Sequence, residues 1–461
     1  MNEMRKENKM GTMPVGKLLV SMSWPAMISM IINALYNIID SIFVARIGEN
    51  ALAAVTLIFP IQFLMIAIGV GTAIGINSLI SRRLGAKLYD KANMAATSGF
   101  MLAFANWLFF AVLGLFFSEK FLKIFSSTEE IIKAGSNYMK IVTLCSLFLM
   151  VTITIEKIIQ GTGNMVRPMF ASVIGATVNI ILDPILIFGY FGMPKMGVTG
   201  AAIATIIGQA VSASINLISI FKKNNDLKIS FFSKEAFDIE TMKEIYAVGL
   251  PSIVMQAIGS ALQFGINLIL SSYSGTAIAV FGVYMRLQSF VFMPTFGINQ
   301  GAMPVFGYNY GAGDKDRLMK AYKIAFLMAL GIMTAGLIVF EMFPERLLSI
   351  FSATGEMYRI GVRALRIVSL CFVPASFGII SAGLFAATGH GMLSLFSSII
   401  RQMVGILPLA YFLGKMGGLE MIWLSFPLAE ILGTAYVIIA MRWLYNKKIK
   451  TLDKLEDNFF E

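Results

Sequence analysis

The sequence predicts an all-α polytopic membrane protein with twelve transmembrane helices in two pseudo-symmetric six-helix lobes. Three observations support this fold class. Hydrophobic residues make up 57% of the 461 positions, charged residues make up 14%, and the mean hydropathy is +0.77. The apolar residues form long runs, and the chain resembles itself after a shift of 226 residues. A soluble protein of this length has too little interior to bury so much apolar surface.

The predicted helices follow the apolar runs in order. Each run is roughly 20 residues or longer, which suits a bilayer-spanning helix and exceeds the length of a barrel strand. The charged residues collect between the runs. We expect helices at residues 18–44, 52–80, 92–117, 134–158, 168–190, 198–221, 245–271, 277–304, 322–343, 360–386, 392–413 and 421–443.

Lysine and arginine set the expected orientation, because cytosolic loops carry an excess of both. With the N-terminus inside, 24 of the 37 basic residues fall in inside segments and 11 at outside ends. We therefore expect a multi-pass protein of the cell membrane with both termini in the cytosol and no cleaved signal peptide. The same bias accounts for the net charge of +11 without a nucleic-acid partner.

An internal repeat organises the chain. Residues 117–145 align with residues 343–371 without a gap, and 13 of these 29 positions are identical, where roughly two are expected by chance. The shift also pairs Pro25 with Pro251, Gly71 with Gly297, Gly75 with Gly301, Gly85 with Gly311, and Asp90 with Asp316. Six spans per copy give both copies the same orientation. We expect lobes at 1–221 and 245–461, with a cytosolic linker at 222–244.

Two similar lobes that can rock about a central site are typical of transporters. The sequence carries no filter-like motif, phosphate loop or Ser/His pair, which argues against a channel or an enzyme. Cys145 and Cys371 fall in apolar spans, so we expect no disulfide, metal centre or cofactor. The single histidine, His390, fits a solvated loop residue, with a proton relay as the alternative.

Carboxylates inside two spans of the first lobe are the main candidate site. In "VNIILDPILIFG", Asn179 and Asp183 share one helix face, and Pro184 removes a backbone hydrogen bond beside them. In "NALYNIID", one face carries Asp40 together with Asn33 and Asn37. Both helices run outward, so the two aspartates come at similar depth and can meet.

The alternative is that each aspartate caps a helix or pairs with a neighbour. The nearest candidate cation, Arg46, lies at the end of a span, however, and an unpaired buried carboxylate costs several kcal/mol unless it is protonated or ion-bound. We expect Asp40 and Asp183 to titrate together and to hold one proton near neutral pH. Tyr36, one turn before Asp40, is either a hydrogen-bond partner or a packing residue.

The second lobe departs from the first. The shift places Ile266 where Asp40 stands, and the seventh helix carries only a neutral polar stripe of Gln256, Ser260, Gln263 and Asn267. We expect this stripe and Asn33 and Asn37 to line the substrate cavity. Arg401 and Glu430 lie near the middle of helices 11 and 12, and we expect a neutralising structural pair, with a substrate role for Glu430 as the alternative.

Several motifs resemble the MATE family of multidrug and toxin extruders, in particular its MepA-like bacterial branch. They are "NIILDPILIFG" followed by "MGVTGAAIAT", then "SRRLGAK", "LPSIVMQ" and "YGAGDKD". The resemblance covers nearly the whole chain. It implies that Asp40, Asn179, Asp183 and Thr205 form a cation site, for a proton or for sodium held by Asp40, Asn179 and Asp183. Major facilitators share the duplication, but their loop carries an aspartate where this chain has Asn77 and Ser81.

The resemblance and the composition together predict a secondary active multidrug exporter. The 31 methionines and 37 phenylalanines suit a cavity for amphipathic organic cations. We expect antiport with protons or sodium, alternating access, a role in antibiotic resistance and a monomer. The alternative is an exporter of an endogenous metabolite or a lipid-linked compound on the same fold.

Overall fold

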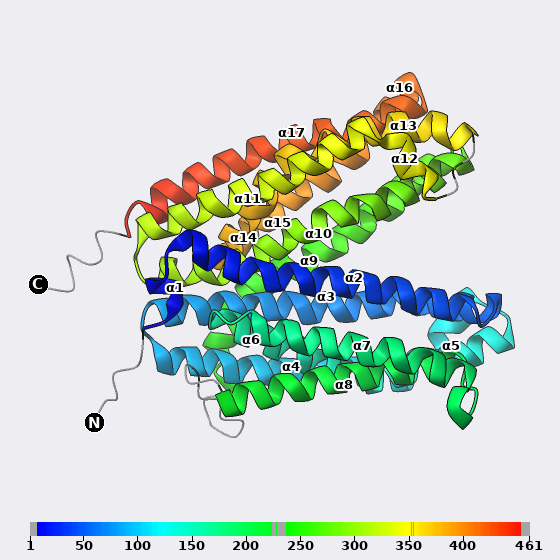
Figure 1. The fold of residues 1–461 in the computed structure, drawn as a ribbon, viewed down its shortest axis with the longest axis horizontal. Coiled ribbons are helices and arrows are strands. Elements are labelled where there is room, and N and C mark those ends of the chain that lie inside the picture. Colours follow the sequence, from blue (N-terminus) through cyan, green and yellow to red (C-terminus); the bar gives the residue numbers. More distant parts are fainter. Residues whose placement is uncertain (1–6, 224–226, 228–236, 352, 354, 453–461) are drawn as a thin grey trace, which may run out of the picture. The chain divides into compact units, whose positions relative to one another are not determined.

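The computed structural model describes residues 7–223, 227, 237–351, 353 and 355–452. Within these ranges every regular element is a helix (Figure 1). Of the expected linker, residues 224–226 and 228–236 lie outside the described residues. The principal helices are α1 (Lys9–Thr12), α2 (Val15–Ala45), α3 (Glu49–Gly85), α4 (Tyr89–Phe125), α5 (Glu129–Leu144), α6 (Ser146–Gly161), α7 (Val166–Phe188), α8 (Val198–Lys223), α9 (Ile239–Ser271), α10 (Gly275–Gly311), α11 (Lys315–Met342), α12 (Pro344–Ser349), α13 (Gly355–Ser369), α14 (Phe372–Ala387), α15 (Gly391–Ser398), the π-helix η3 (Ile399–Ile406), α16 (Leu407–Gly417) and α17 (Leu419–Leu444).

The described helices account for the predicted spans. Ten are long and apolar enough to cross a membrane, and two further pairs become spans when each bent pair is counted once. Helices prevail because a chain in lipid must satisfy its own backbone hydrogen bonds. The chain is therefore a multi-pass membrane protein with the twelve spans that its sequence predicts.

Two of the predicted spans, at 134–158 and 360–386, are bent. The pair α5 and α6 meets at 42°, and the pair α13 and α14 meets at 48°. At the first bend the Thr143 hydroxyl donates to the Met139 carbonyl, and the Ser146 hydroxyl donates to the Thr143 carbonyl. Such side-chain bonds compete with the helical backbone pattern. Cys145 and Cys371, which mark the two bends, are 226 residues apart and both are free thiols.

The helix boundaries repeat with the same spacing. Helix α3 begins at Glu49 and α10 at Gly275, while α4 begins at Tyr89 and α11 at Lys315. Helices α6 and α14 match at both ends after the same shift. The internal repeat of the sequence is therefore a repeat of structure.

Two compact units divide the described chain. One comprises 28–84 and 88–249, and its largest buried side chains include Phe110 and Ile58. The other comprises 1–27, 85–87 and 250–461, with Trp423 and Tyr284 in its core. The unit that contains 88–249 thus includes the first part of α9, while the rest of α9 belongs to the other unit. In the same way, the unit that contains 1–27 includes the first part of α2, while the rest of α2 belongs to the first unit.

Glycines of the repeat make room for these segments. A Cβ on Gly301 of α10 would lie 2.7 Å from the Ser23 Cα of α2. The equivalent Gly75 of α3 lies against the Ile245 carbonyl of α9 in the same way. Because only glycine allows the two backbones to approach so closely, these repeated glycines determine where α2 packs against α10 and where α9 packs against α3.

Candidate functional site

Asp183 lies in α7 without solvent exposure. Neither of its carboxylate oxygens has a hydrogen-bond partner within the described part of the chain. Helix α7 continues through Pro184 to Phe188 and ends at Gly189, whose φ of 78° is left-handed. The helix therefore holds a buried, unpartnered carboxyl group one turn before its end.

Asp40 of α2 is the charged residue that interacts electrostatically with Asp183. The two carboxylates are close enough for their charges to interact. Asp40 is partly exposed, but its Oδ1 is buried and has no partner among the described residues. The structure therefore brings together the two aspartates that the sequence places on separate helix faces, and it gives neither an ion pair in the part of the chain that it describes.

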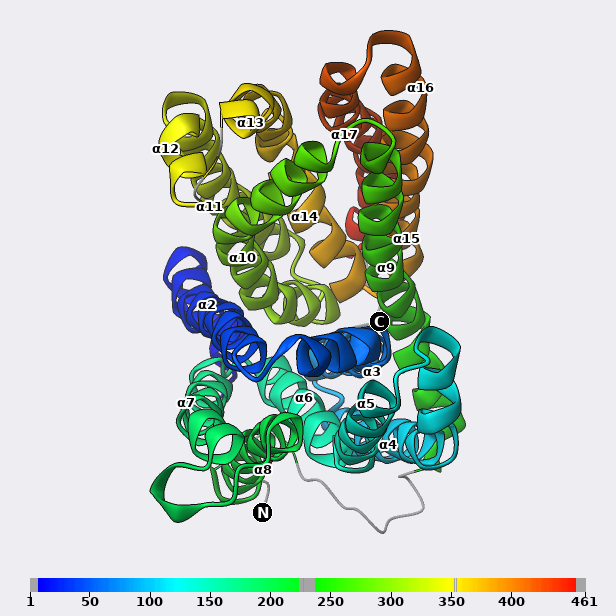
Figure 2. The same cartoon turned by 90° about the vertical axis from the view of Figure 1, so that its right-hand side faces the viewer.

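Helices α7 and α8 bring amide and hydroxyl groups to the same place. The Asn179 Nδ2 donates to the Thr205 Oγ1 at 3.4 Å, and the Asn179 Oδ1 is buried without a described partner. Gly175 and Gly208 allow this contact, since a Cβ on either would lie 2.7 Å from the carbonyl oxygen of the other. Figures 1 and 2 show the two helices running side by side.

Tyr36 completes the set that the sequence proposes. Its side chain forms a hydrogen bond with Thr205 and interacts electrostatically with both aspartates. All five candidates, Tyr36, Asp40, Asn179, Asp183 and Thr205, thus lie in one polar cluster inside one compact unit.

Two further members of this cluster escape the sequence analysis. Tyr138 of α5 is 4% exposed and interacts with both Asp40 and Asp183. Its hydroxyl accepts a hydrogen bond from Gln62 Nε2 of α3 at 3.1 Å. Neither residue shares a helix with the aspartates, so no spacing in the sequence connects them to the site.

Helix α6 of the same unit carries a charged residue, Glu156, that contacts α7. The Glu156 Oε1 accepts a hydrogen bond from the Ser172 Oγ of α7 at 2.8 Å. Its neighbour Lys157 donates to Gln160 Oε1 at 2.8 Å. Lys157 lies in the last part of α6 (Ser146–Gly161), at the end of the span that the sequence predicts at 134–158.

The polar residues expected to line a substrate cavity differ in their exposure. Gln263 lines a cavity of about 290 Å³ in the unit that contains 250–461. Asn33 and Ser260 are exposed, and Gln256 and Asn267 are partly exposed. Asn37 belongs to α2, but its side chain lies outside the described residues.

Arg401 and Glu430 face each other across η3 and α17. The Arg401 Nη1 lies 3.6 Å from the Glu430 Oε1, and both side chains line the cavity that contains Gln263. Glu430 is 5% exposed. Arg401 and Glu430 are therefore an ion pair, as the sequence suggests, and the pair borders an open volume.

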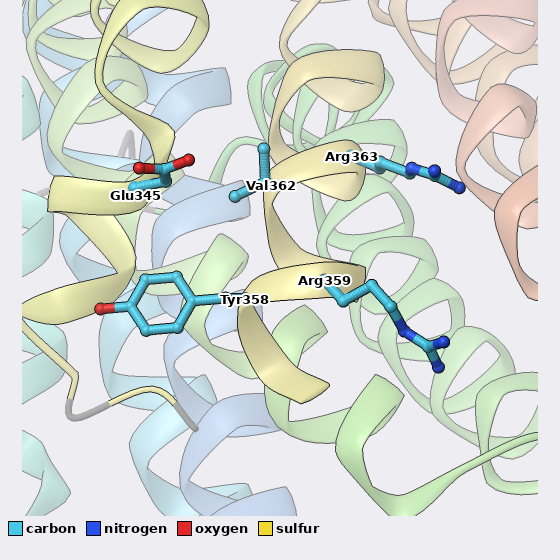
Figure 3. A pocket seen from close by; sticks show the side chains of 5 residues that line it. All are labelled: Glu345, Tyr358, Arg359, Val362 and Arg363. Carbon is cyan, nitrogen blue, oxygen red and sulfur yellow. The ribbon is translucent and has the colours of Figure 1, made fainter. Parts of the chain in front are cut away.

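Another hollow, of about 580 Å³, lies at α12 and α13. Figure 3 shows Glu345 and Tyr358 pointing to one side of α13, while Arg359 and Arg363 point to the other. Arg363 pairs with Glu420. Because these side chains diverge, the hollow lacks the converging polar groups of a binding site.

The comparisons with known proteins agree with this architecture. The model of the MatE family matches residues 25–185 and again residues 251–412, which together exceed half of the chain. A multidrug export protein named MepA from Staphylococcus haemolyticus is 27% identical over 441 residues and is aligned over 95% of both chains. A protein named FAD transporter from Shewanella oneidensis is 26% identical, over 96% of this chain and 98% of its own.

Solved structures give the same result. The outward-facing structure of a multidrug resistance MATE family transporter superposes with a TM-score of 0.88 at 26% identity, over 97% of this chain and 99% of the other. The two family matches begin at Pro25 and Pro251, which are the positions that the sequence repeat pairs. The chain is therefore a membrane transporter rather than an enzyme, and it belongs to the MatE family.

Proposed function

We propose that the protein is a secondary active multidrug exporter that moves amphipathic organic cations out of the cell in exchange for protons or sodium. The observation that supports this most is the meeting of Asp40 and Asp183 in one cluster without an ion pair among the described residues. Two ionised carboxylates that lie close together in a region of low dielectric repel each other unless a cation binds between them.

The coupling cation is bound by Asp40 and Asp183, with Asn179, Thr205 and Tyr36 as neutral partners. A proton shared by the two carboxyls, or a sodium ion held by Asp40, Asn179 and Asp183, removes the repulsion. A neutralised site can be closed away from water, and a doubly charged site cannot easily be closed. Binding and release of the cation therefore favour different arrangements of the lobes.

The lobes 1–221 and 245–461 alternate in access to the two sides of the membrane, with both termini in the cytosol of a monomeric protein. Asn33, Asn37, Gln256, Ser260, Gln263 and Asn267 contribute polar contacts to substrate. The names of the MepA relatives support a multidrug substrate range. The basic inside segments support the orientation.

A second candidate function is the export of an endogenous metabolite. It is favoured by the relative named FAD transporter, which aligns over nearly the full length of both chains. Uptake of a fluorescent organic cation and of a flavin nucleotide into inside-out vesicles distinguishes the two functions, since a multidrug exporter moves the first without the second.

The central test replaces each carboxylate by its amide. Asp183→Asn and Asp40→Asn keep the shape of a protonated carboxyl but cannot exchange a proton. We expect both variants to remain folded and to bind ethidium, and to lose roughly tenfold or more of the efflux rate driven by a proton or sodium gradient in proteoliposomes.

The matched control is Asp90→Asn, which removes an exposed carboxylate from the start of α4 in the same unit. It should export ethidium at the wild-type rate. Wild-type efflux by Asp183→Asn would show that this carboxylate is structural, and the coupling mechanism would then be wrong.

A further inference from the structure

The cavity beside the Arg401–Glu430 pair is built within a single compact unit. It has a volume of about 290 Å³ and lies among α9, α10, α14, η3 and α17. The ribbons of α9, α10, α14 and α17 can be followed in Figure 2. That volume is at the lower end of the range for small-molecule sites, which is about 300–1,000 Å³. It suits a compact fused-ring molecule.

The walls of this cavity are aromatic and thioether side chains. The rings of Phe281, Tyr284 and Phe426 contact one another, with centroids 6.1–6.2 Å apart. Phe292 and Met285 extend the same surface. Because these rings hold one another in place, they offer a preformed apolar surface for an aromatic ligand.

The charged end of the cavity has one group of each sign. Arg401 Nη1 and Glu430 Oε1 are 3.6 Å apart, which is longer than a charge-assisted hydrogen bond of about 2.7–2.9 Å. Arg401 belongs to the π-helical turn η3, a rare conformation that is frequent at functional sites. Gly433 of α17 leaves room for the Arg401 stem, since a Cβ there would lie 3.2 Å from the Arg401 Cβ.

A hydroxyl group adds a third polar contact. Tyr284 lines the cavity, and its hydroxyl is buried with no oxygen or nitrogen partner among the described residues. Its described polar neighbour is the Cys371 thiol, which is a weak acceptor. A buried hydroxyl without a strong acceptor is available to donate to a ligand.

These features select the charge of the ligand. A cavity that contains one cation and one anion is neutral, so a ligand with a single charge leaves that charge uncompensated in low dielectric. A ligand with both charges can separate Arg401 from Glu430 and pair with each of them.

We propose that this cavity binds aromatic zwitterions, with a cationic nitrogen on Glu430, a carboxylate on Arg401 and the Tyr284 hydroxyl, and the ring system between the aromatic walls. The inference rests on the proposed function and narrows it, because such ligands are organic cations that also carry a carboxylate.

Two fluorescent xanthene dyes test the proposal at equilibrium, without a gradient. One is a diaminoxanthylium benzoate, which is a zwitterion, and the other is its methyl ester, which is a cation of the same shape. We expect the wild-type protein in detergent to bind the free benzoate about tenfold more tightly than the ester, as one charge-assisted contact predicts. Arg401→Gln should remove this preference by weakening the zwitterion alone. Glu430→Gln should weaken both dyes.

Folding is controlled separately, because each single change strands a buried charge. The double variant Arg401→Leu with Glu430→Leu removes both charges and should melt at a higher temperature than either single variant, yet show no preference between the dyes. The control is Arg366→Gln, which breaks the ion pair between Arg366 and Glu341. These two side chains lie 3.9 Å apart and do not line the cavity, so this variant should keep the wild-type preference for the benzoate dye.

Equal affinity of the wild-type protein for the two dyes would overturn the proposal, and so would an unchanged preference in Arg401→Gln and in the double variant. Failure of the proposed function has a different signature. In that case the wild-type protein would not move the ester dye under a proton or sodium gradient, whatever the equilibrium preference.

Discussion

Three of the described aspartates differ in their surroundings. Asp183 is buried without a described partner, Asp40 is partly exposed beside the same polar cluster, and Asp238 is partly exposed just before α9. The Asp238 Oδ2 accepts a hydrogen bond from the Thr241 backbone N–H at 3.0 Å, in the manner of a helix N-cap. The same residue type therefore forms the proposed coupling site in the membrane and a helix cap outside it.

The capping role of Asp238 predicts a pH dependence. Hydrogen bonds from Thr241 hold the pKa of this carboxyl below its ordinary value of 3.8. A depressed pKa in the folded state means that the cap stabilises the start of α9 above the ordinary pKa and loses this effect as the pH falls through the folded value.

We expect amide protection in residues 239–249 to weaken below about pH 4 in the wild-type protein. In Asp238→Asn, whose amide oxygen still caps but does not titrate, this acid-dependent loss should disappear. Hydrogen exchange measured at several acid pH values, and corrected for intrinsic rates, checks this. An identical pH profile in both proteins would contradict the capping argument.

At the scale of elements, the crossing of α7 and α8 positions the polar cluster. Gly175 and Gly208 let the two backbones approach, and Asn179 then reaches Thr205. A Cβ on Gly208 would also lie 3.0 Å from the Asn179 Cβ. The geometry of the candidate site therefore depends on two residues that carry no functional group.

Gly208→Ala should separate these helices. We expect a loss of about 1–3 kcal/mol in the free energy of unfolding, as overpacking usually produces, and reduced gradient-driven efflux. Gly331→Ala is the control, because an added Cβ there meets nothing within 4 Å and the better helix propensity of alanine should raise stability slightly. Equal melting temperatures in the two variants would contradict the close-approach argument.

At the scale of the whole molecule, two arginines hold the helix segments that cross between the repeats. Arg83 of α3 donates to the Lys91 carbonyl at 2.6 Å and to Thr241 Oγ1 at 3.1 Å, and it pairs with Glu244 at 3.3 Å. In the other unit, Arg317 of α11 donates from Nε to the Met10 carbonyl at 3.1 Å and also to the Met13 carbonyl. Each arginine thus fixes the start of the first helix of the opposite repeat.

This arrangement predicts separable effects on local opening. Arg83→Gln should speed amide exchange in residues 239–249 by roughly 10- to 100-fold, because hydrogen bonds of a charged donor contribute about 1.5–3 kcal/mol. Exchange in residues 9–27 should stay unchanged. Arg317→Gln should give the opposite pattern.

Lys123→Gln, which removes an exposed pair with Glu119, should change neither segment. If either arginine variant changed amide exchange equally in residues 239–249 and in residues 9–27, the arginine contacts would act through the global stability of the protein. The prediction that each arginine stabilises one segment would then be wrong.

The sequence by itself determined the class, the number of spans and the repeat. Long apolar runs require helices in lipid, and thirteen identities in one aligned segment reveal the duplication. It also identified Asp40, Asn179 and Asp183 as candidate site residues, because a polar side chain inside an apolar run is energetically costly and is easily recognised in the sequence.

Only the tertiary structure decided which other residues join these aspartates. Tyr138 and Gln62 come from α5 and α3, and the cavity beside Glu430 draws its lining from five helical elements. The sequence pattern also does not predict the bends at Cys145 and Cys371. Nor does it predict that the first parts of α2 and α9 each belong to a different compact unit from the rest of the helix. Hydrophobic periodicity reports which residues avoid water, but the identity of a neighbouring helix depends on backbone approach and side-chain shape, which residues distant in sequence decide together.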